Sequence, residues 1–152
     1  MNIGALTPPW RVPTFVNGTL QFSPLSYFKG QPLVLCCPSL LTAQESILLE
    51  GQIACFQDRY TTLAAFVSKH TIQNLPWMKP SSEFRLPLLT DPLNRLSRAL
   101  GLSRHLTAKR CETLFFSGTG RLMFRLIHDL NVRGFSRVLE VTEQYCDSAK
   151  AQ

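Results

Sequence analysis

The sequence predicts an α/β domain in which helices cover both faces of a mixed central sheet. Three features carry this expectation. The apolar run 33–37, which stops at Pro38, is typical of a buried central strand. A helix start signal follows at Thr42, and two apolar runs flank the turn at 117–120, which predicts a strand–turn–strand. Strands and helices therefore mix along the chain, as they do in α/β folds.

The first half of the chain is expected to hold a β-hairpin and a long helix around the central strand. Asn17-Gly18 between two short apolar runs predicts the hairpin turn. Thr42 and Glu45 form a capping box, in which each side chain satisfies a free backbone N–H at the helix start. Apolar residues then recur at helical spacing as far as Phe66, so one helix is expected over 42–66.

The second half is expected to add strands and two helices. A short strand is predicted at 84–89. A helix follows from Asp91, a capping residue with proline next to it, to Gly101, a residue type that ends helices. Strands at 113–116 and 122–126 flank the later turn. Apolar residues at helical spacing predict a final helix over 134–145.

Composition narrows the class of protein. The chain has 152 residues, of which 45% are hydrophobic and 17% charged, so one compact domain over 1–152 is expected. No apolar run approaches the roughly 18 residues of a membrane span, and the N-terminus has no signal-peptide pattern, so a cytoplasmic protein is expected. Five cysteines without a CxxC or a zinc spacing predict neither a disulfide framework nor a metal site.

The net charge of +6 is concentrated in the second half of the chain. A solvated surface is the favoured interpretation of its densest basic stretch, because no aromatic residue is interleaved there to stack on nucleic acid. An anion- or nucleic-acid-binding surface is the alternative, and it requires binding that weakens steeply with salt. The basic residues of this stretch are Arg95, Arg98, Arg104, Lys109 and Arg110.

Short landmarks recur in a fixed order over nearly the whole chain. They are Ile3-Gly4 with Pro9-Trp10, Asn17-Gly18, the segment 28–35, Val67-Ser68 with His70 and Trp77, the segments 86–91 and 100–102, and Val132-Arg133. In this order they resemble the peroxiredoxins of the alkyl hydroperoxide reductase/thiol-specific antioxidant class. The resemblance implies a thioredoxin-like three-layer fold with a single redoxin domain, no cofactor and a homodimer. It also implies a hydroperoxide and a thioredoxin-type reductant as partners.

The active-site signature of that family is Pro-x-x-x-Thr-x-x-Cys, which places a thiolate in the first turn of a helix. Pro38 and Thr42 stand at the proline and threonine positions of this signature, and Glu45 stands at the cysteine position. A carboxylate cannot accept an oxygen atom and cycle through a sulfenic acid. The resemblance therefore implies that the usual peroxidatic cysteine is lost and that Glu45 serves first as a helix cap. The alternative is that Glu45 acts as a general base or as a gate that repels anions.

The family also supplies an arginine just before the last strand–turn–strand. Counting back from Gly120 puts Cys111 at that position, whereas a one-residue slip would put Arg110 there, and both alignments stay open. Two thiols could replace the missing one: Cys37 at the end of the central strand, and Cys111 across the pocket. The competing interpretation is that both are buried and pack as small apolar residues.

These residues lead to two hypotheses. The first is a peroxiredoxin-like protein of the antioxidant class without ordinary peroxidase turnover, which acts as a binding or structural partner. The second is a thiol-dependent peroxidase or oxidoreductase that works through a displaced cysteine, Cys111 or Cys37. The pocket positions assigned by the resemblance are Cys37, Thr42, Glu45, Arg110 and Cys111.

Overall fold

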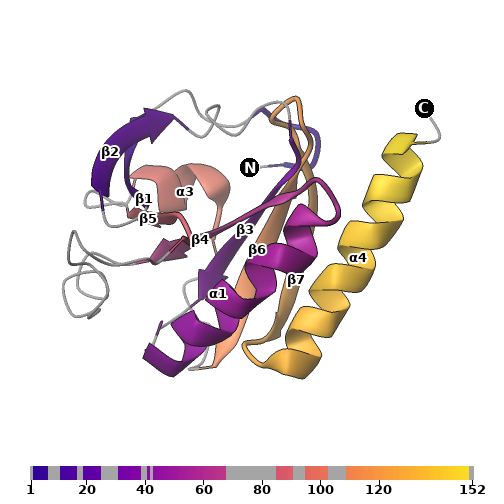
Figure 1. Ribbon diagram of the computed structural model, residues 1–152. Coiled ribbons are helices and arrows are strands. Elements are labelled where there is room, and N and C mark those ends of the chain that lie inside the picture. Colours follow the sequence, from indigo (N-terminus) through magenta and orange to yellow (C-terminus); the bar gives the residue numbers. More distant parts are fainter. Residues whose placement is uncertain are drawn as a thin grey trace.

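The computed structural model describes residues 2–6, 11–16, 19–24, 31–38, 41, 43–67, 85–90, 95–102 and 109–150. Seven strands form one mixed sheet in the order β2-β1-β5-β4-β3-β6-β7 (Figure 1). The central strands β3, β4 and β5 run parallel to one another, and every other neighbouring pair is antiparallel. The strands are β1 (Arg11–Val16), β2 (Thr19–Pro24), β3 (Leu33–Pro38), β4 (Thr62–Val67), β5 (Leu88–Thr90), β6 (Arg110–Phe116) and β7 (Leu122–Asp129).

Helices lie on both faces of this sheet, as predicted. The helices α1 (Ala43–Gln57) and α4 (Val132–Lys150) cover one face, and the short helix α3 (Arg95–Leu100) covers the other (Figure 1). One apolar cluster joins the sheet to Phe56 of α1 and Phe135 of α4, and a second joins it to Leu100 of α3. The sheet is thus buried on both faces, and three layers result.

The helix expected over 42–66 is wrong beyond residue 57. The chain turns after Gln57, with Tyr60 at a φ of 54°, and then forms β4. This strand lies parallel between β3 and β5 and is buried at all but its first residue. A strand that is buried on both faces has an unbroken apolar sequence, which periodicity alone does not distinguish from a buried helix.

The other predicted elements are confirmed where the structure describes them. The hairpin of β1 and β2 flanks Asn17-Gly18, and the strand predicted at 84–89 is confirmed only at its end, where β5 begins at Leu88. Helix α3 ends at Leu100, directly before Gly101, which has a φ of 67°. The capping residues Thr42 and Asp91 lie outside the described residues.

The final helix is longer than predicted, and its start is capped. Asn131 precedes the helix, and its Oδ1 accepts a hydrogen bond of 2.8 Å from the backbone N–H of Gly134. Near its other end, Glu143 accepts a 3.1 Å bond from Nε of Arg59, which follows α1. The two helices of this layer are therefore tied together. Among the described residues, no helix is both long and apolar enough to cross a membrane.

Candidate functional site

The alternation of side chains along β3 and β6 separates the two candidate thiols. Cys36 pairs with Thr113, and Cys37 pairs with Glu112, so these pairs lie on opposite faces. Cys111 belongs to the apolar cluster under α1 and α4, whereas Cys37 belongs to the cluster under α3. The structure does not bring Cys37 and Cys111 together in one pocket.

Cys111 lies in a compact group of polar side chains, which we name the thiol cluster. It consists of Cys36, Cys111, Thr113 and His128, each at most 3% exposed. The Thr113 hydroxyl is its centre. This oxygen lies 3.6 Å from the sulfur of Cys111, 3.7 Å from the sulfur of Cys36 and 2.5 Å from Nε2 of His128. The four side chains come from three neighbouring strands, β3, β6 and β7.

Geometry assigns the protons of the neutral cluster. Nδ1 of His128 lies 2.9 Å from the backbone oxygen of Asp129, and because a carbonyl only accepts, Nδ1 carries a proton. In the neutral ring, Nε2 therefore accepts the hydrogen of the Thr113 hydroxyl. The S–H of Cys111 has two acceptors within reach, the hydroxyl oxygen at 3.6 Å and the backbone oxygen of Glu112 at 3.7 Å. A protonated Nε2 would reverse this direction, so that the hydroxyl donates to a thiolate.

The electrostatics of the cluster favour an anion on one of its two sulfurs. The hydrogen bond from Cys36, followed by the bond and charge of His128, lowers the pKa of Cys111 to about 6 against the effect of burial. The bond to Cys111 and burial raise the pKa of Cys36 well above its ordinary value. Burial opposes protonation of His128, but the bond and charge of Cys111 outweigh it and raise the histidine pKa.

His128 is held by the start of α4. Its ring packs edge-to-face on Phe135, with the ring centres 5.6 Å apart. Gly134 approaches so closely that a Cβ there would lie 1.8 Å from the Asp129 oxygen and 3.2 Å from Nδ1 of His128. The absence of a side chain at this position thus permits the contact between α4 and the cluster.

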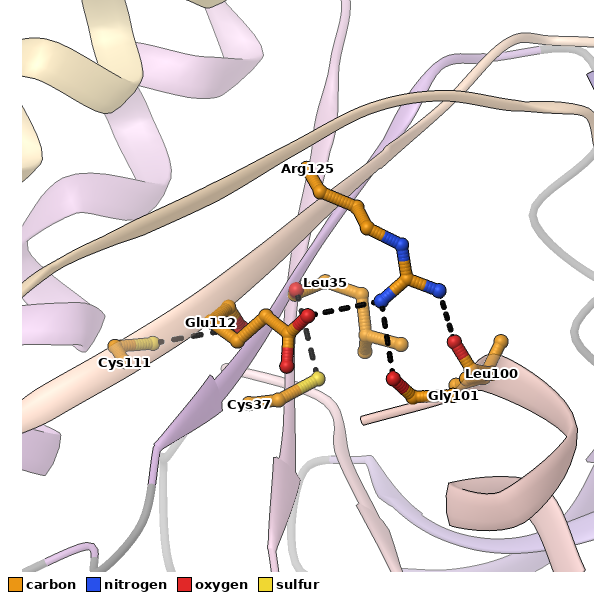
Figure 2. A network of polar contacts seen from close by, with 7 residues as sticks. All are labelled: Leu35, Cys37, Leu100, Gly101, Cys111, Glu112 and Arg125. Atoms are coloured by element: carbon orange, nitrogen blue, oxygen red, sulfur yellow. Dashed lines mark hydrogen bonds and ion pairs between the residues drawn. The ribbon is translucent and has the colours of Figure 1, made fainter. Parts of the chain in front are cut away.

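The opposite face carries a second polar group, the Arg125 network (Figure 2). One nitrogen of the Arg125 guanidinium lies 2.8 Å from the carboxylate of Glu112, which is 4% exposed, and 3.4 Å from the Gly101 oxygen. Another guanidinium nitrogen donates to the Leu100 oxygen. A cation on the last carbonyls of a helix stabilises that end. This network therefore fastens α3 to the sheet.

Cys37 lies beside this network as a buried thiol. Its S–H donates to the Leu35 oxygen at 3.8 Å, and Figure 2 shows its sulfur on the side of the sheet toward Glu112. Burial, followed by the negative charges of Cys111 and Glu112, raises the pKa of Cys37 well above its ordinary value. A thiol that stays protonated is a weak nucleophile, because the thiolate is the reactive form.

The remaining predicted positions lie apart from the thiol cluster. Glu45 is half-buried in the first turn of α1. Arg110 alternates with Cys111 along β6 and forms an exposed ion pair of 2.9 Å with the Asp129 carboxylate. Thr42 lies outside the described residues. In the described ranges no group of three or more His, Cys, Asp or Glu side chains could hold a metal ion.

Sequence reasoning missed Thr113 and His128 as members of the site and treated Cys36 as core alone. The nearest signal is the hairpin around 117–120. Extending the pairing of Phe116 with Leu122 straight back would place Ile127 opposite Cys111, and only the register shift between Phe115 and Phe116 brings His128 there. The first predicted strand began at Thr113 and the second ended at Leu126, so the pair of Cys111 and His128 lay just outside both.

Comparison with known proteins gives matches among solved structures. No protein-family model and no curated protein matches the chain. The reduced 2-Cys peroxiredoxin of Plasmodium vivax has a TM-score of 0.75 at 17% identity, over 99% of this chain and 99% of that chain. The mitochondrial 2-Cys peroxiredoxin of Plasmodium falciparum has a TM-score of 0.72 at 14% identity, over 95% of this chain and 94% of its own. AhpC of Enterococcus faecalis has a TM-score of 0.69 at 16% identity, over 97% of this chain and 96% of its own.

Similarity at this level of identity concerns the fold. The chain has the thioredoxin-like fold of the peroxiredoxins, which confirms the fold class predicted from the sequence. The match covers nearly all of each chain.

Proposed function

We propose that this chain is a peroxiredoxin-like protein of the antioxidant and thiol-redox class, without the family's ordinary peroxidase turnover, that acts as a binding or structural partner. The observation that carries the proposal is the position of Glu45, the third residue of α1. A carboxylate in the first turn favours the positive end of the helix dipole and caps free N–H groups. It supplies no sulfur to attack a peroxide.

The burial of three of the four cysteines whose side chains the structure describes supports the same proposal. Cys36 and Cys111 are 0% exposed, and Cys37 is 6% exposed. Rapid turnover requires a thiolate that peroxide and reductant can both reach. The described cysteines are free thiols, which suits a reducing compartment such as the cytoplasm. We place this function in one peroxiredoxin-like domain over residues 1–152.

The test is consumption of a hydroperoxide by the wild-type protein with a thioredoxin-type reductant. We expect no consumption above the rate of the reductant system alone, because the first turn of α1 contains no cysteine. Stoichiometric loss of peroxide that stops after about one equivalent would agree with this proposal. Sustained rapid turnover would refute it.

The partner that we propose for the edge of the sheet is a second copy of the chain. β7 is the last strand of the sheet, and residues 4–6 pair only with its start, near Leu122. Beyond this point its outer edge faces no other strand in the described part of the chain. Three large apolar side chains on this strand are exposed: Met123 at 37%, Phe124 at 44% and Ile127 at 43%. An open apolar edge is suited to pairing with an identical edge.

The replacement Ile127→Lys is expected to weaken the homodimer. Fully burying an isoleucine is worth about 1.5–3 kcal/mol, and Ile127 is 43% exposed, so two copies lose roughly 1.3–2.6 kcal/mol and the Kd is expected to rise by at least about tenfold. Sedimentation velocity over a concentration series measures this change. Ile47→Lys is the matched control, because Ile47 is 68% exposed on α1, away from the edge. Equal effects of both variants would argue against β7 as the interface.

A second function is favoured by the thiol cluster: slow thiol oxidation through Cys111, which is the displaced-cysteine hypothesis. Its support is the lowered pKa of Cys111, about 6, together with the contacts to Thr113 and Cys36. In this function the partners are a small hydroperoxide and a thiol reductant. Cys37 is the weaker candidate, because its raised pKa keeps it protonated.

Brief exposure to hydroperoxide, followed by mass-spectrometric mapping, distinguishes the sulfurs. We expect oxygen on Cys111 and none on Cys37, because only the first is held as a thiolate near neutral pH. The variant Cys111→Ser should lose the oxidation at position 111, and the oxidation of every other cysteine should be the same as in the wild type. Oxidation confined to Cys146, or absent from every cysteine, would remove this function.

A further inference from the structure

The thiol cluster contains a continuous chain of contacts from a sulfur to an imidazole. We propose that His128 accepts the proton of the Cys111 thiol through the hydroxyl of Thr113, so that the cluster stores a thiolate–imidazolium pair inside the fold. Thr113 and His128 then act as positioning residues for chemistry at Cys111. This inference deepens the second function and rests on it for its reactant, a small hydroperoxide.

The distances allow the transfer without movement of the backbone. The Cys111 sulfur lies 3.6 Å from the Thr113 oxygen, and that oxygen lies 2.5 Å from Nε2 of His128. A hydroxyl can accept one proton and donate another at the same time. The proton of Cys111 therefore passes to Thr113, while the former hydroxyl proton passes to Nε2. Nδ1 keeps its own proton on the Asp129 oxygen, 2.9 Å away.

The groups around His128 decide whether the charged ring is tolerated. The Asp129 oxygen and the Cys111 thiolate stabilise it, whereas Arg110 opposes it. Arg110 is in turn paired with the Asp129 carboxylate at 2.9 Å. From α4, the ring meets the apolar Phe135, and Cys36 on β3 stays a neutral thiol.

The charged side chains of the covering helices are directed elsewhere or lie at the surface. On α1, the Glu50 carboxylate accepts the backbone N–H groups of Arg85 and Leu86, each at 3.0 Å, and Glu45 is half-buried in the first turn. On α4, Arg133 and Arg137 are exposed. The sulfur anion is therefore the main counter-charge that the structure supplies to His128.

The chemistry of the pair balances with a hydroperoxide. The Cys111 thiolate attacks the terminal oxygen, an S–O bond forms and the O–O bond breaks. The leaving alkoxide takes the proton held on Nε2 of His128, delivered through Thr113. The sulfur is oxidised to a sulfenic acid, and the hydroperoxide is reduced to an alcohol. Two equivalents of an external thiol return the sulfenic acid to the thiol, with release of water and formation of the disulfide of that thiol.

The test is the pH titration of the His128 ring, followed by nitrogen chemical shifts in NMR spectra of the full chain. In the wild type we expect an imidazolium at pH 7. Cys111→Ser removes the ionisable thiol but leaves a side chain of similar size, so the His128 pKa should fall toward its ordinary value. Thr113→Val should lower it in the same way, and Thr113→Ser, which restores the hydroxyl, should return it. His70 and His105 are the internal controls.

A second measurement covers the case in which a variant of the cluster folds poorly. The ultraviolet absorbance of the thiolate, followed against pH, should titrate in the wild type with a midpoint of about 6. With this midpoint, about nine-tenths of the Cys111 side chains would be ionised at pH 7. A thiol with the ordinary pKa of about 8.5 would be ionised to only a few per cent at the same pH. His128→Asn should show that loss of thiolate.

The outcomes separate the relay from the function that it would serve. A His128 titration that is the same in the wild type and in Cys111→Ser, or a neutral ring in the wild type at pH 7, overturns the relay. Coupled titrations without any oxidation of Cys111 by peroxide would refute the second function and leave the relay established.

Discussion

Replacing Arg125 by methionine is expected to lower the free energy of unfolding by about 3 kcal/mol. The replacement removes the guanidinium that lies 2.8 Å from the buried carboxylate of Glu112 and leaves that charge in an apolar layer. It also removes the donors to the Leu100 and Gly101 oxygens at the end of α3. The value is at the low end for a buried pair, because the Arg125 side chain is 25% exposed. Urea denaturation measures it.

Arg110→Met is the matched control on the neighbouring strand. Its ion pair with Asp129 has side chains that are 41% and 58% exposed, and exposed pairs contribute less than about 1 kcal/mol. The double replacement of Glu112 by glutamine and Arg125 by methionine should recover part of the stability lost in the single variant. Equal losses for Arg125→Met and Arg110→Met would contradict the role given to the Arg125 network.

Gly134→Ala is expected to destabilise the fold by about 2 kcal/mol and to displace His128. A Cβ at this position would lie 1.8 Å from the Asp129 oxygen, so the first turn of α4 or the end of β7 must shift. Because Nδ1 of His128 bonds to that oxygen, the shift should also change the histidine titration. Thermal and urea unfolding measure the first effect, and NMR measures the second.

Gly51→Ala is the control for the general effect of replacing a helical glycine. Gly51 is exposed in α1, and an added Cβ would meet nothing within 4 Å. This variant is expected to gain about 0.5–1 kcal/mol, because glycine in a helix interior is less stable than alanine. Destabilisation of the same size at both glycines would show that the close approach at Gly134 is not the cause.

The local signals in the sequence predicted most of the fold. The apolar run before Pro38, the Asn17-Gly18 hairpin, the capping box and the turn at 117–120 each act over a few residues, and each marks an observed element. β4 escaped them. Its run is buried on both faces and so has no period of two, and the turn before it carries no glycine or proline, only Tyr60 with a positive φ. That strand is specified by its place in the sheet.

The candidate site was predicted in part. Cys111 was selected by counting from Gly120, but its real neighbours come from strand pairing, which places His128 opposite it. Cys37 was assigned to the same pocket because it directly precedes Pro38 at the end of the central strand. The alternation of adjacent residues in β3 turns its side chain to the other face. Contacts between strands depend on register, which the sequence alone did not define here.

We propose that Glu45 occupies the position of the usual nucleophile and that ordinary peroxidase chemistry is lost with it. Peroxide consumption with a thioredoxin-type reductant tests it most directly when the wild type is compared with Glu45→Cys and with Glu45→Gln. A thiol in the first turn of α1 would have its anion stabilised by the helix dipole. We expect the wild type and Glu45→Gln to stay at the background rate and Glu45→Cys to consume peroxide at least about tenfold faster. A wild type that turns peroxide over as fast as Glu45→Cys would refute the loss of peroxidase chemistry at position 45.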